Sequence, residues 1–241
     1  MEIRVDPKKL VTTLLWIIAV LTAIHSVVLF LYFYWDDDYV YGLVDLFDFD
    51  IEGNFPTFYS AVAMLLATGL LALITHANWN RESGHRFYWL LLSFIMLFMT
   101  FDEATAIHET IGSYFEDYLD ASGFLYLMWV VPYGVAVGVL GLFFLKFVLA
   151  LPSQTRNLFI AAGVIFLSGA MGLEVFGARE ADLNGVETIT YCVLYTFEEL
   201  LEMLGIVLFI YALASHLTTE FGRVSLVLNP AGTESDSEKR D

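Results

Sequence analysis

Six long apolar runs constrain this chain more than any other feature of its sequence. A helix of about 20 residues crosses a hydrocarbon core of roughly 30 Å, and a backbone in lipid must satisfy its own hydrogen bonds. The sequence is 58% hydrophobic with a mean hydropathy of +0.68, well above the range of soluble domains. We therefore predict an all-α, polytopic membrane protein with six transmembrane helices in one bundle in the lipid bilayer, at residues 10–33, 56–78, 87–114, 124–149, 158–177 and 188–217.

The distribution of basic residues predicts the orientation of this bundle. Only Arg179 falls on one side of the six-span arrangement, and the other ten of the 11 lysines and arginines fall on the opposite side. An excess of basic residues marks the cytoplasmic side, so both termini are expected in the cytoplasm and the protein in the plasma membrane. The first run is too long for a cleavable signal peptide and is expected to remain as a span.

The chain divides into a transmembrane domain, residues 1–228, and a polar tail, residues 229–241, that is expected to be disordered and cytoplasmic. The longest connection, residues 35–54, alternates acidic and apolar side chains, which predicts a short amphipathic helix on the outer interface. Pro132 is expected to kink the fourth span. A homo-oligomer is compatible with the sequence.

The net charge of −17 is concentrated in the connections predicted to lie outside. Nucleic acid is excluded as a partner, because it requires basic patches. The acidic face fits either a solvated surface or a funnel that concentrates cations. The single cysteine, Cys192, lies within the sixth run, so an internal disulfide and a cluster of thiolate ligands are both excluded.

Acidic residues and two histidines interrupt the apolar runs without a lysine or arginine beside them. Each costs at least about 2.5–3.5 kcal/mol to insert, so such residues usually mark a functional site. With a helical rise of about 1.5 Å per residue, the acids of three spans and His25 of a fourth fall at one depth, in the outer half of the membrane. Carboxylates with imidazole are the ligand set of divalent iron, manganese or zinc. The candidate metal ligands are Glu103, Glu174, Glu198, Glu202, His108 and His25.

The neighbours of these residues are expected to support the site or relay protons. Tyr195, Glu198, Glu199 and Glu202 have the i, i+3, i+4, i+7 spacing of a single helix face, which must point into the bundle. On a straight third span, Asp102, Glu103, His108 and Glu109 cannot all point at one atom. The supporting residues are Asp102, Glu109, Glu199, Tyr195 and Tyr133.

Three functions remain open on the sequence. The leading hypothesis is a metal-dependent membrane enzyme, with a site that opens outward and holds one or two divalent ions. The second is a cation or proton transporter that uses the same acids. The third is a structural or sensory protein with protonated acids. A weak internal similarity between residues 100–103 and 196–199 would fit the inverted repeat of a transporter, whereas the scarcity of Gly/Pro pairs within the spans does not.

Overall fold

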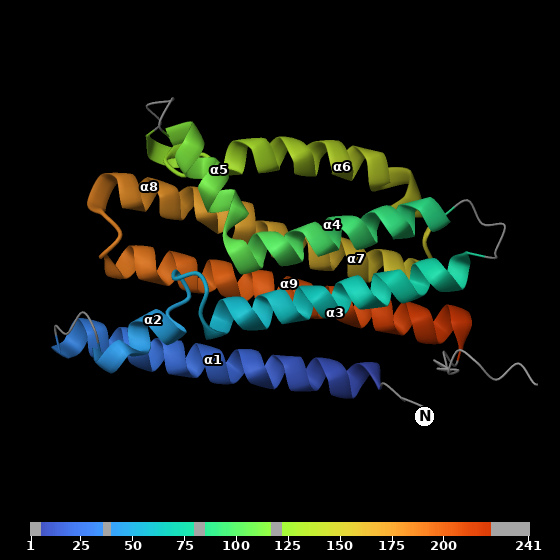
Figure 1. Ribbon diagram of the computed structural model, residues 1–241, viewed down its shortest axis with the longest axis horizontal. Coiled ribbons are helices and arrows are strands. Elements are labelled where there is room, and N and C mark those ends of the chain that lie inside the picture. The colour runs from blue at the N-terminus through green and yellow to red at the C-terminus, as the bar shows by residue number, and fades with distance from the viewer. Residues whose placement is uncertain (1–5, 36–39, 80–84, 117–121, 223–241) are drawn as a thin grey trace, which may run out of the picture.

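The computed structural model describes residues 6–35, 40–79, 85–116 and 122–222, and every regular element in these ranges is helical. The predicted tail, residues 229–241, lies outside them. The long helices lie side by side along the length of the molecule (Figure 1). In chain order the elements are α1 (Pro7–Trp35), η1 (Val40–Gly42), α2 (Leu43–Phe47), α3 (Phe55–Asn78), α4 (Arg86–Thr105), α5 (Ile107–Glu116), η2 (Gly123–Leu125), α6 (Val130–Ala150), α7 (Ser153–Leu167), η3 (Ser168–Leu173), α8 (Glu174–Asn184) and α9 (Ile189–Phe221).

Six helical segments of the described chain are long and apolar enough to cross a membrane, as predicted. They indicate a membrane protein. They are Pro7–Tyr34, Phe55–Asn78, Arg86–Thr105, Val130–Ala150, Ser153–Asn184 and Ile189–Phe221. Many of their large apolar side chains face outward, including Trp16, Phe30 and Leu142, which suits contact with lipid.

The centre of the packing is α9, which contacts α1, α3, α7, η3 and α8. Its buried side chains include Ile206, Ile210 and Leu213. Its first turn is capped by Thr188, whose hydroxyl accepts a hydrogen bond from the backbone N–H of Tyr191 at 3.1 Å. α3 begins in the same way, because the Asn54 side chain accepts a bond from the Thr57 N–H at 3.2 Å.

Three predicted spans differ from the helices observed. The third, residues 87–114, is not one helix: α4 ends at Thr105, the next residue, Ala106, is left-handed (φ 50°), and α5 continues in a new direction (Figure 1). The fourth starts later than predicted, at Val130, so Pro132 lies in the first turn of α6, where its missing N–H breaks no helical bond. The predicted kink there is wrong. The fifth is longer than predicted, since α7, η3 and α8 run on to Asn184.

The loop between α1 and α3 contains the predicted short helix in part, as α2. Residues 36–39 of this loop lie outside the described chain. Its second half, residues 48–54, leads to the start of α3 and lies beside α9, since Asp50 accepts a hydrogen bond from the Tyr191 hydroxyl (Figure 1).

Candidate functional site

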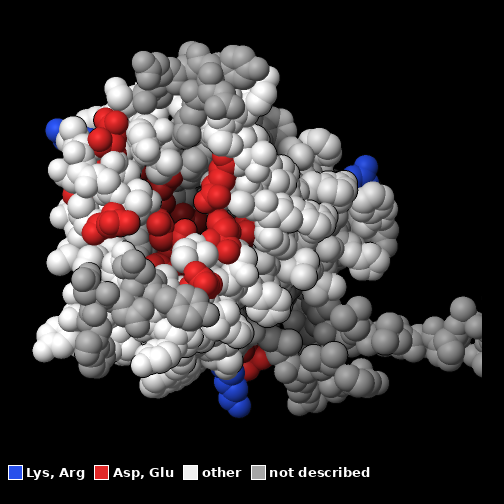
Figure 2. Space-filling view, turned by 60° about the vertical axis from the view of Figure 1, so that its left-hand side comes forward, with Lys and Arg blue, Asp and Glu red and all other residues white. Residues whose placement is uncertain are grey.

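An acid-lined cavity of about 680 Å³ lies within the helices. Its walls come from α3, α4, α5, α6, α7, η3, α8 and α9 and from the loops before α3 and α6. It opens at the end of the molecule that carries α2, α5 and α8, where acidic side chains surround a hollow (Figure 2). The described lining includes no lysine or arginine, and its acidic residues are Asp50, Glu52, Asp102, Glu103, Glu109, Glu174, Glu198, Glu199 and Glu202.

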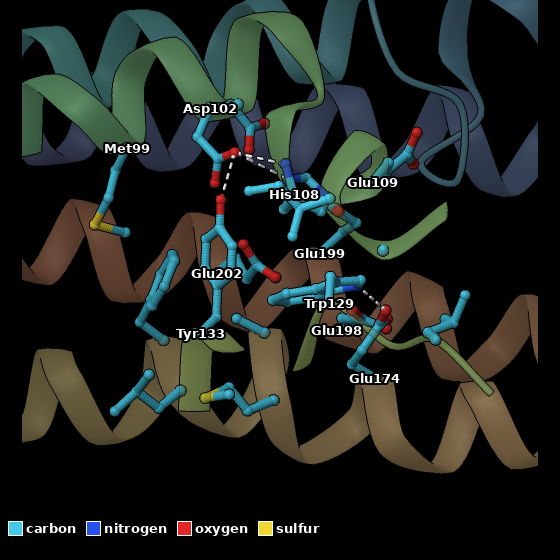
Figure 3. A pocket seen from close by; sticks show the side chains of 18 of the residues that line it. Met99, Asp102, His108, Glu109, Trp129, Tyr133, Glu174, Glu198, Glu199 and Glu202 are labelled. Carbon is cyan, nitrogen blue, oxygen red and sulfur yellow. Dashed lines mark hydrogen bonds and ion pairs between the residues drawn. The ribbon is translucent and has the colours of Figure 1, made fainter. Parts of the chain in front are cut away.

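The break at Ala106 assembles one wall of this cavity. Because the chain turns there, Asp102 at the end of α4 meets His108 at the start of α5 (Figure 3). Oδ1 of Asp102 accepts hydrogen bonds from the backbone N–H of His108 at 2.8 Å and from the Tyr133 hydroxyl at 3.0 Å. The same oxygen lies 3.5 Å from Nδ1 of the His108 ring. Asp102 thereby fixes the orientation of the imidazole.

The other ring nitrogen of His108 faces two further carboxylates. Nε2 lies 3.9 Å from Oε1 of Glu52. One donor atom each from Glu52, His108 and Glu109 lie within 4.8 Å of one another, which is close enough for the three to hold a metal ion. Oε2 of Glu52 is buried and has no hydrogen-bond partner among the described residues. A buried oxygen of this kind is costly unless something binds it.

Two acids of the loop before α3, Asp50 and Glu52, have a raised pKa. Burial raises the pKa of Glu52 to about 7, with the charges of Glu109 and Asp102 adding to the effect. Burial likewise raises the pKa of Asp50 to about 6, although the Tyr191 hydroxyl donates a 3.0 Å hydrogen bond to it. Burial alone would lower the pKa of His108. The hydrogen bond and charge of Asp102 and the charges of the neighbouring acids outweigh this effect, so the pKa of His108 is raised. Excess negative charge here is neutralised by protons or by a bound cation.

The opposite wall is formed by η3, α8 and α9. Glu174 accepts a 2.7 Å hydrogen bond from the Trp129 indole N–H, and Glu198 is buried with 7% of its surface exposed. The π-helical turn η3 precedes Glu174 directly, and such turns often occur at functional sites. A Cβ at Gly169 would lie 2.5 Å from the Glu198 carbonyl oxygen. Only glycine therefore allows η3 to approach the acid-bearing face of α9 this closely.

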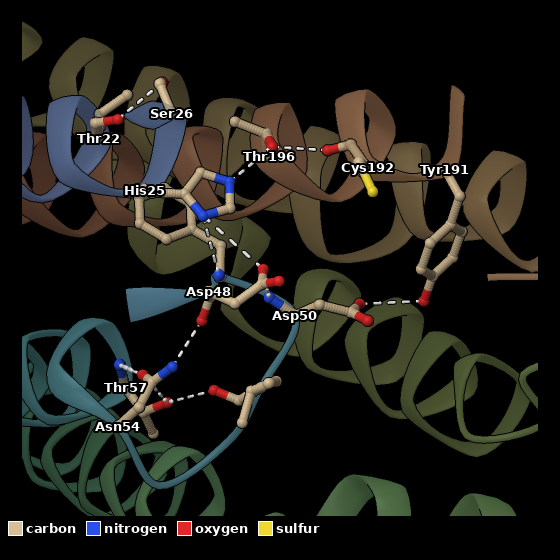
Figure 4. Close-up of polar contacts among 12 residues, drawn as sticks. Thr22, His25, Ser26, Asp48, Asp50, Asn54, Thr57, Tyr191, Cys192 and Thr196 are labelled. Carbon is tan, nitrogen blue, oxygen red and sulfur yellow. Dashed lines mark hydrogen bonds and ion pairs between the residues drawn. The ribbon is translucent and has the colours of Figure 1, made fainter. Parts of the chain in front are cut away.

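His25 lies outside this cavity, in a separate polar network (Figure 4). Its ring is fully buried and stacks on Phe49 with 4.1 Å between centroids. Nε2 lies 2.9 Å from the Thr196 hydroxyl, and Nδ1 accepts a hydrogen bond from the Phe49 backbone N–H at 3.3 Å. Both nitrogens are engaged within the protein, so the structure does not place His25 as a ligand of the cavity.

The remaining residues singled out in the sequence line this one cavity. On a straight helix, Asp102, Glu103, His108 and Glu109 could not all point at one atom. The third span is not straight, because the helix breaks at Ala106, so this restriction does not apply. Sequence reasoning missed the parts played by Asp50, Glu52 and Trp129, which lie in connections. One feature of the sequence could have indicated Glu52. It lies two residues before Asn54, the residue that caps α3, and so lies close to the start of that helix. The predicted residues in the lining are Glu103, Glu174, Glu198, Glu202, His108, Asp102, Glu109, Glu199, Tyr195 and Tyr133.

Comparison with known families adds one assignment. A model of the domain of unknown function DUF8692 matches residues 12–217. The chain belongs to this family. The matched region includes every residue that lines the cavity, so the cavity is part of the DUF8692 domain. No curated protein and no solved structure matches the chain. Its function is therefore argued from the site itself.

Proposed function

We propose that this protein is a metal-dependent membrane enzyme that binds one or two divalent cations in the acid-lined cavity. The observation that carries the proposal is the position of His108 between carboxylates. Nδ1 faces Asp102 at 3.5 Å, and Nε2 faces Glu52. Histidines that bind metals typically present one nitrogen to the ion and the other to a carboxylate that fixes the ring.

The donor atoms suit iron, zinc or manganese. One ion would be held by Glu52, His108 and Glu109, whose donor atoms already lie within 4.8 Å of one another. The partnerless oxygen of Glu52 supports this placement, since a cation would satisfy it. A second ion would be held by the acids of the opposite wall, with Glu103 beside them. A mixed set of carboxylates and imidazole is typical of sites for these metals.

An ion at this position would lower the pKa of a bound water and so generate a nucleophile at neutral pH. Only three protein ligands come from the first group, which leaves coordination positions for water and substrate. Carboxylates that do not hold the metal can accept the proton that this water releases.

Catalysis is better supported than transport. The cavity's acids lie in the loop before α3, at the end of α4, in α5, at the start of α8 and in the first half of α9, all toward one end of the molecule. Beyond Glu202, α9 continues with the buried apolar side chains Met203, Ile206, Val207 and Ile210, so this stretch of α9 offers a cation no ligand. A transporter needs access from both sides of the membrane.

The cavity is proposed to open outside the cell. The end of the helices opposite the cavity carries the basic residues Lys8, Arg86, Lys146 and Arg156, and the positive-inside tendency puts that end in the cytoplasm. This placement is consistent with plasma-membrane localisation and with cytoplasmic termini.

Metal analysis of the purified protein by mass spectrometry tests the proposal. We expect stoichiometric iron, zinc or manganese in the wild type and its loss in His108→Gln. His76→Gln is the matched control, because His76 is exposed on the last turn of α3, at the end away from the cavity. The proposal fails if the wild type carries no metal and none of the three ions raises its thermal midpoint. The acids would then be simply protonated.

A further inference from the structure

The acid-lined cavity continues into an apolar groove between α4 and α6. On α4, Ile95, Phe98 and Met99 line it, followed by Asp102. These four have the i, i+3, i+4, i+7 spacing of one helix face. The groove is therefore polar at the mouth and apolar behind it.

The facing side of α6 repeats this pattern. Tyr133, Ala136, Val137 and Leu140 line the cavity with the same spacing. The two helices run in opposite directions, and the Tyr133 hydroxyl donates to Asp102 at 3.0 Å, so their polar ends lie at one level. Seven residues beyond this pair correspond to roughly 10 Å of apolar wall.

Beyond Gly134, the part of α6 along the groove is packed loosely against the other helices. Its buried side chains, Phe144 and Phe147, both lie in its second half. A Cβ added at Gly138 or Gly141 would meet no atom within 4 Å. Phe98 lines the groove and is 48% exposed, and it lies on a helix suited to spanning the membrane. The groove thus borders the region where lipid chains would lie.

We infer that the groove holds the alkyl chain of a lipid-like substrate whose polar head group reaches the acids and His108. This inference rests on the proposed function and names its substrate class. An apolar channel that ends at a polar pair matches an amphiphile with a single chain. A helix from a second copy is about 10–12 Å across with its side chains and would not fit a cavity of about 680 Å³ that also contains the acids. Such a volume is typical of sites for small molecules.

The head group is expected to offer oxygen donors. Nine acidic side chains line the cavity, and a bare anionic head would be repelled by them. With the proposed cation in place, a carboxylate, hydroxyl or carbonyl oxygen could complete its coordination. Binding of an anionic amphiphile should therefore depend on metal.

Photolabelling with a palmitic acid analogue that carries a diazirine in its chain tests this inference. The full-length protein is labelled in nanodiscs, with metal content measured on the same samples. We expect cross-links mapped to the lining residues Ile95, Met99, Val137 and Leu140, and we expect added chelator to reduce them. Val137→Trp should fill the groove and lower this labelling about tenfold, through lost burial of chain methylenes. Val139→Trp is the matched control, since Val139 is 61% exposed on the same helix and is not part of the lining.

The outcomes separate the two proposals. Equal labelling of wild type and Val137→Trp, with metal bound in both, would overturn the lipid inference and leave the metal site supported. Labelling confined to outward positions such as Val139 would overturn it as well. Labelling of the groove in protein that contains no metal would instead overturn the proposed metal dependence while supporting the groove as a chain-binding site.

Discussion

Asp102→Asn is the substitution that best isolates how the cavity would hold a metal. The side chain has three contacts through Oδ1: the His108 N–H at 2.8 Å, the Tyr133 hydroxyl at 3.0 Å and the His108 ring at 3.5 Å. Asparagine retains a carbonyl oxygen that can accept the first two bonds. It removes the charge that faces the imidazole. The break at Ala106 should therefore persist while the ring loses its anionic partner.

The expected effect follows from the role of such partners. Removing the carboxylate behind a metal-binding histidine typically lowers metal affinity by 10–100-fold. At a metal concentration of 100 times the dissociation constant, binding stabilises the wild type by about 2.7 kcal/mol. A roughly 30-fold loss of affinity reduces this to about 0.9 kcal/mol by the same relation. The variant should thus lose about two thirds of the stabilisation by metal, with its metal-free stability much less affected.

The assay is the thermal midpoint of the purified protein in detergent, with and without added divalent ion, at matched protein concentration. His76→Gln should retain the full shift induced by metal, and His108→Gln should lose it. The reasoning would be refuted if Asp102→Asn showed the wild-type shift while His108→Gln did not. His108 could then bind metal, but its orientation by Asp102 would contribute nothing.

Three other predictions concern packing, pH and topology. A Cβ at Gly205 would lie 2.8 Å from the Phe166 backbone nitrogen, so Gly205→Ala should destabilise by about 1–3 kcal/mol in chemical unfolding, whereas Gly141→Ala on open α6 should not. Without metal, folding raises the pKa of Glu52 from 4.5 to about 7. The folded protein then binds the extra proton, so stability falls as pH rises between these values. One pKa unit corresponds to about 1.4 kcal/mol of stability, and this figure is reduced because 30% of the Glu52 side chain is exposed to solvent. The free energy of unfolding should therefore fall by roughly 1–2 kcal/mol over this pH range in the wild type, and Glu52→Gln should not show this fall. Lys8→Cys, with the native cysteine replaced, should resist impermeant thiol reagents in intact cells, and rapid labelling would reverse the proposed orientation.

The number and positions of the membrane-capable helices were largely predictable, because lipid leaves a chain few choices. Apolar length alone located all six segments. The errors occurred where hydrophobicity does not decide the outcome. The third run remains moderately apolar through Ile107 and Ile111, and nothing in that pattern indicates the left-handed residue at Ala106. Pro132 was read as a kink because the start of its helix was placed too early.

The cavity acids that lie within the apolar runs were also predictable, since an ionisable group in such a run must face something other than lipid. The stripe on α9, from Tyr195 to Glu202, lines the cavity as its helical spacing predicted. The roles of Asp50 and Glu52 were not predictable in this way. Acids in a connection resemble any solvated surface, and only the tertiary return of the loop brings Glu52 to His108.

His25 shows that a buried polar residue in a membrane-capable helix can hold a neighbouring loop in place. Its two nitrogens join α9, through Thr196, to the backbone at Phe49. Asp48, adjacent in sequence, accepts a hydrogen bond through its carbonyl from the side chain of Asn54, which in turn caps α3. This network fixes both ends of the segment that carries Asp50 and Glu52. The imidazole that the sequence places at the depth of the acids therefore positions this loop, and the imidazole that lines the cavity is that of His108. Placing His25 in an apolar helix costs free energy, but its hydrogen bonds position Asp50 and Glu52, which lie more than twenty residues farther along the chain.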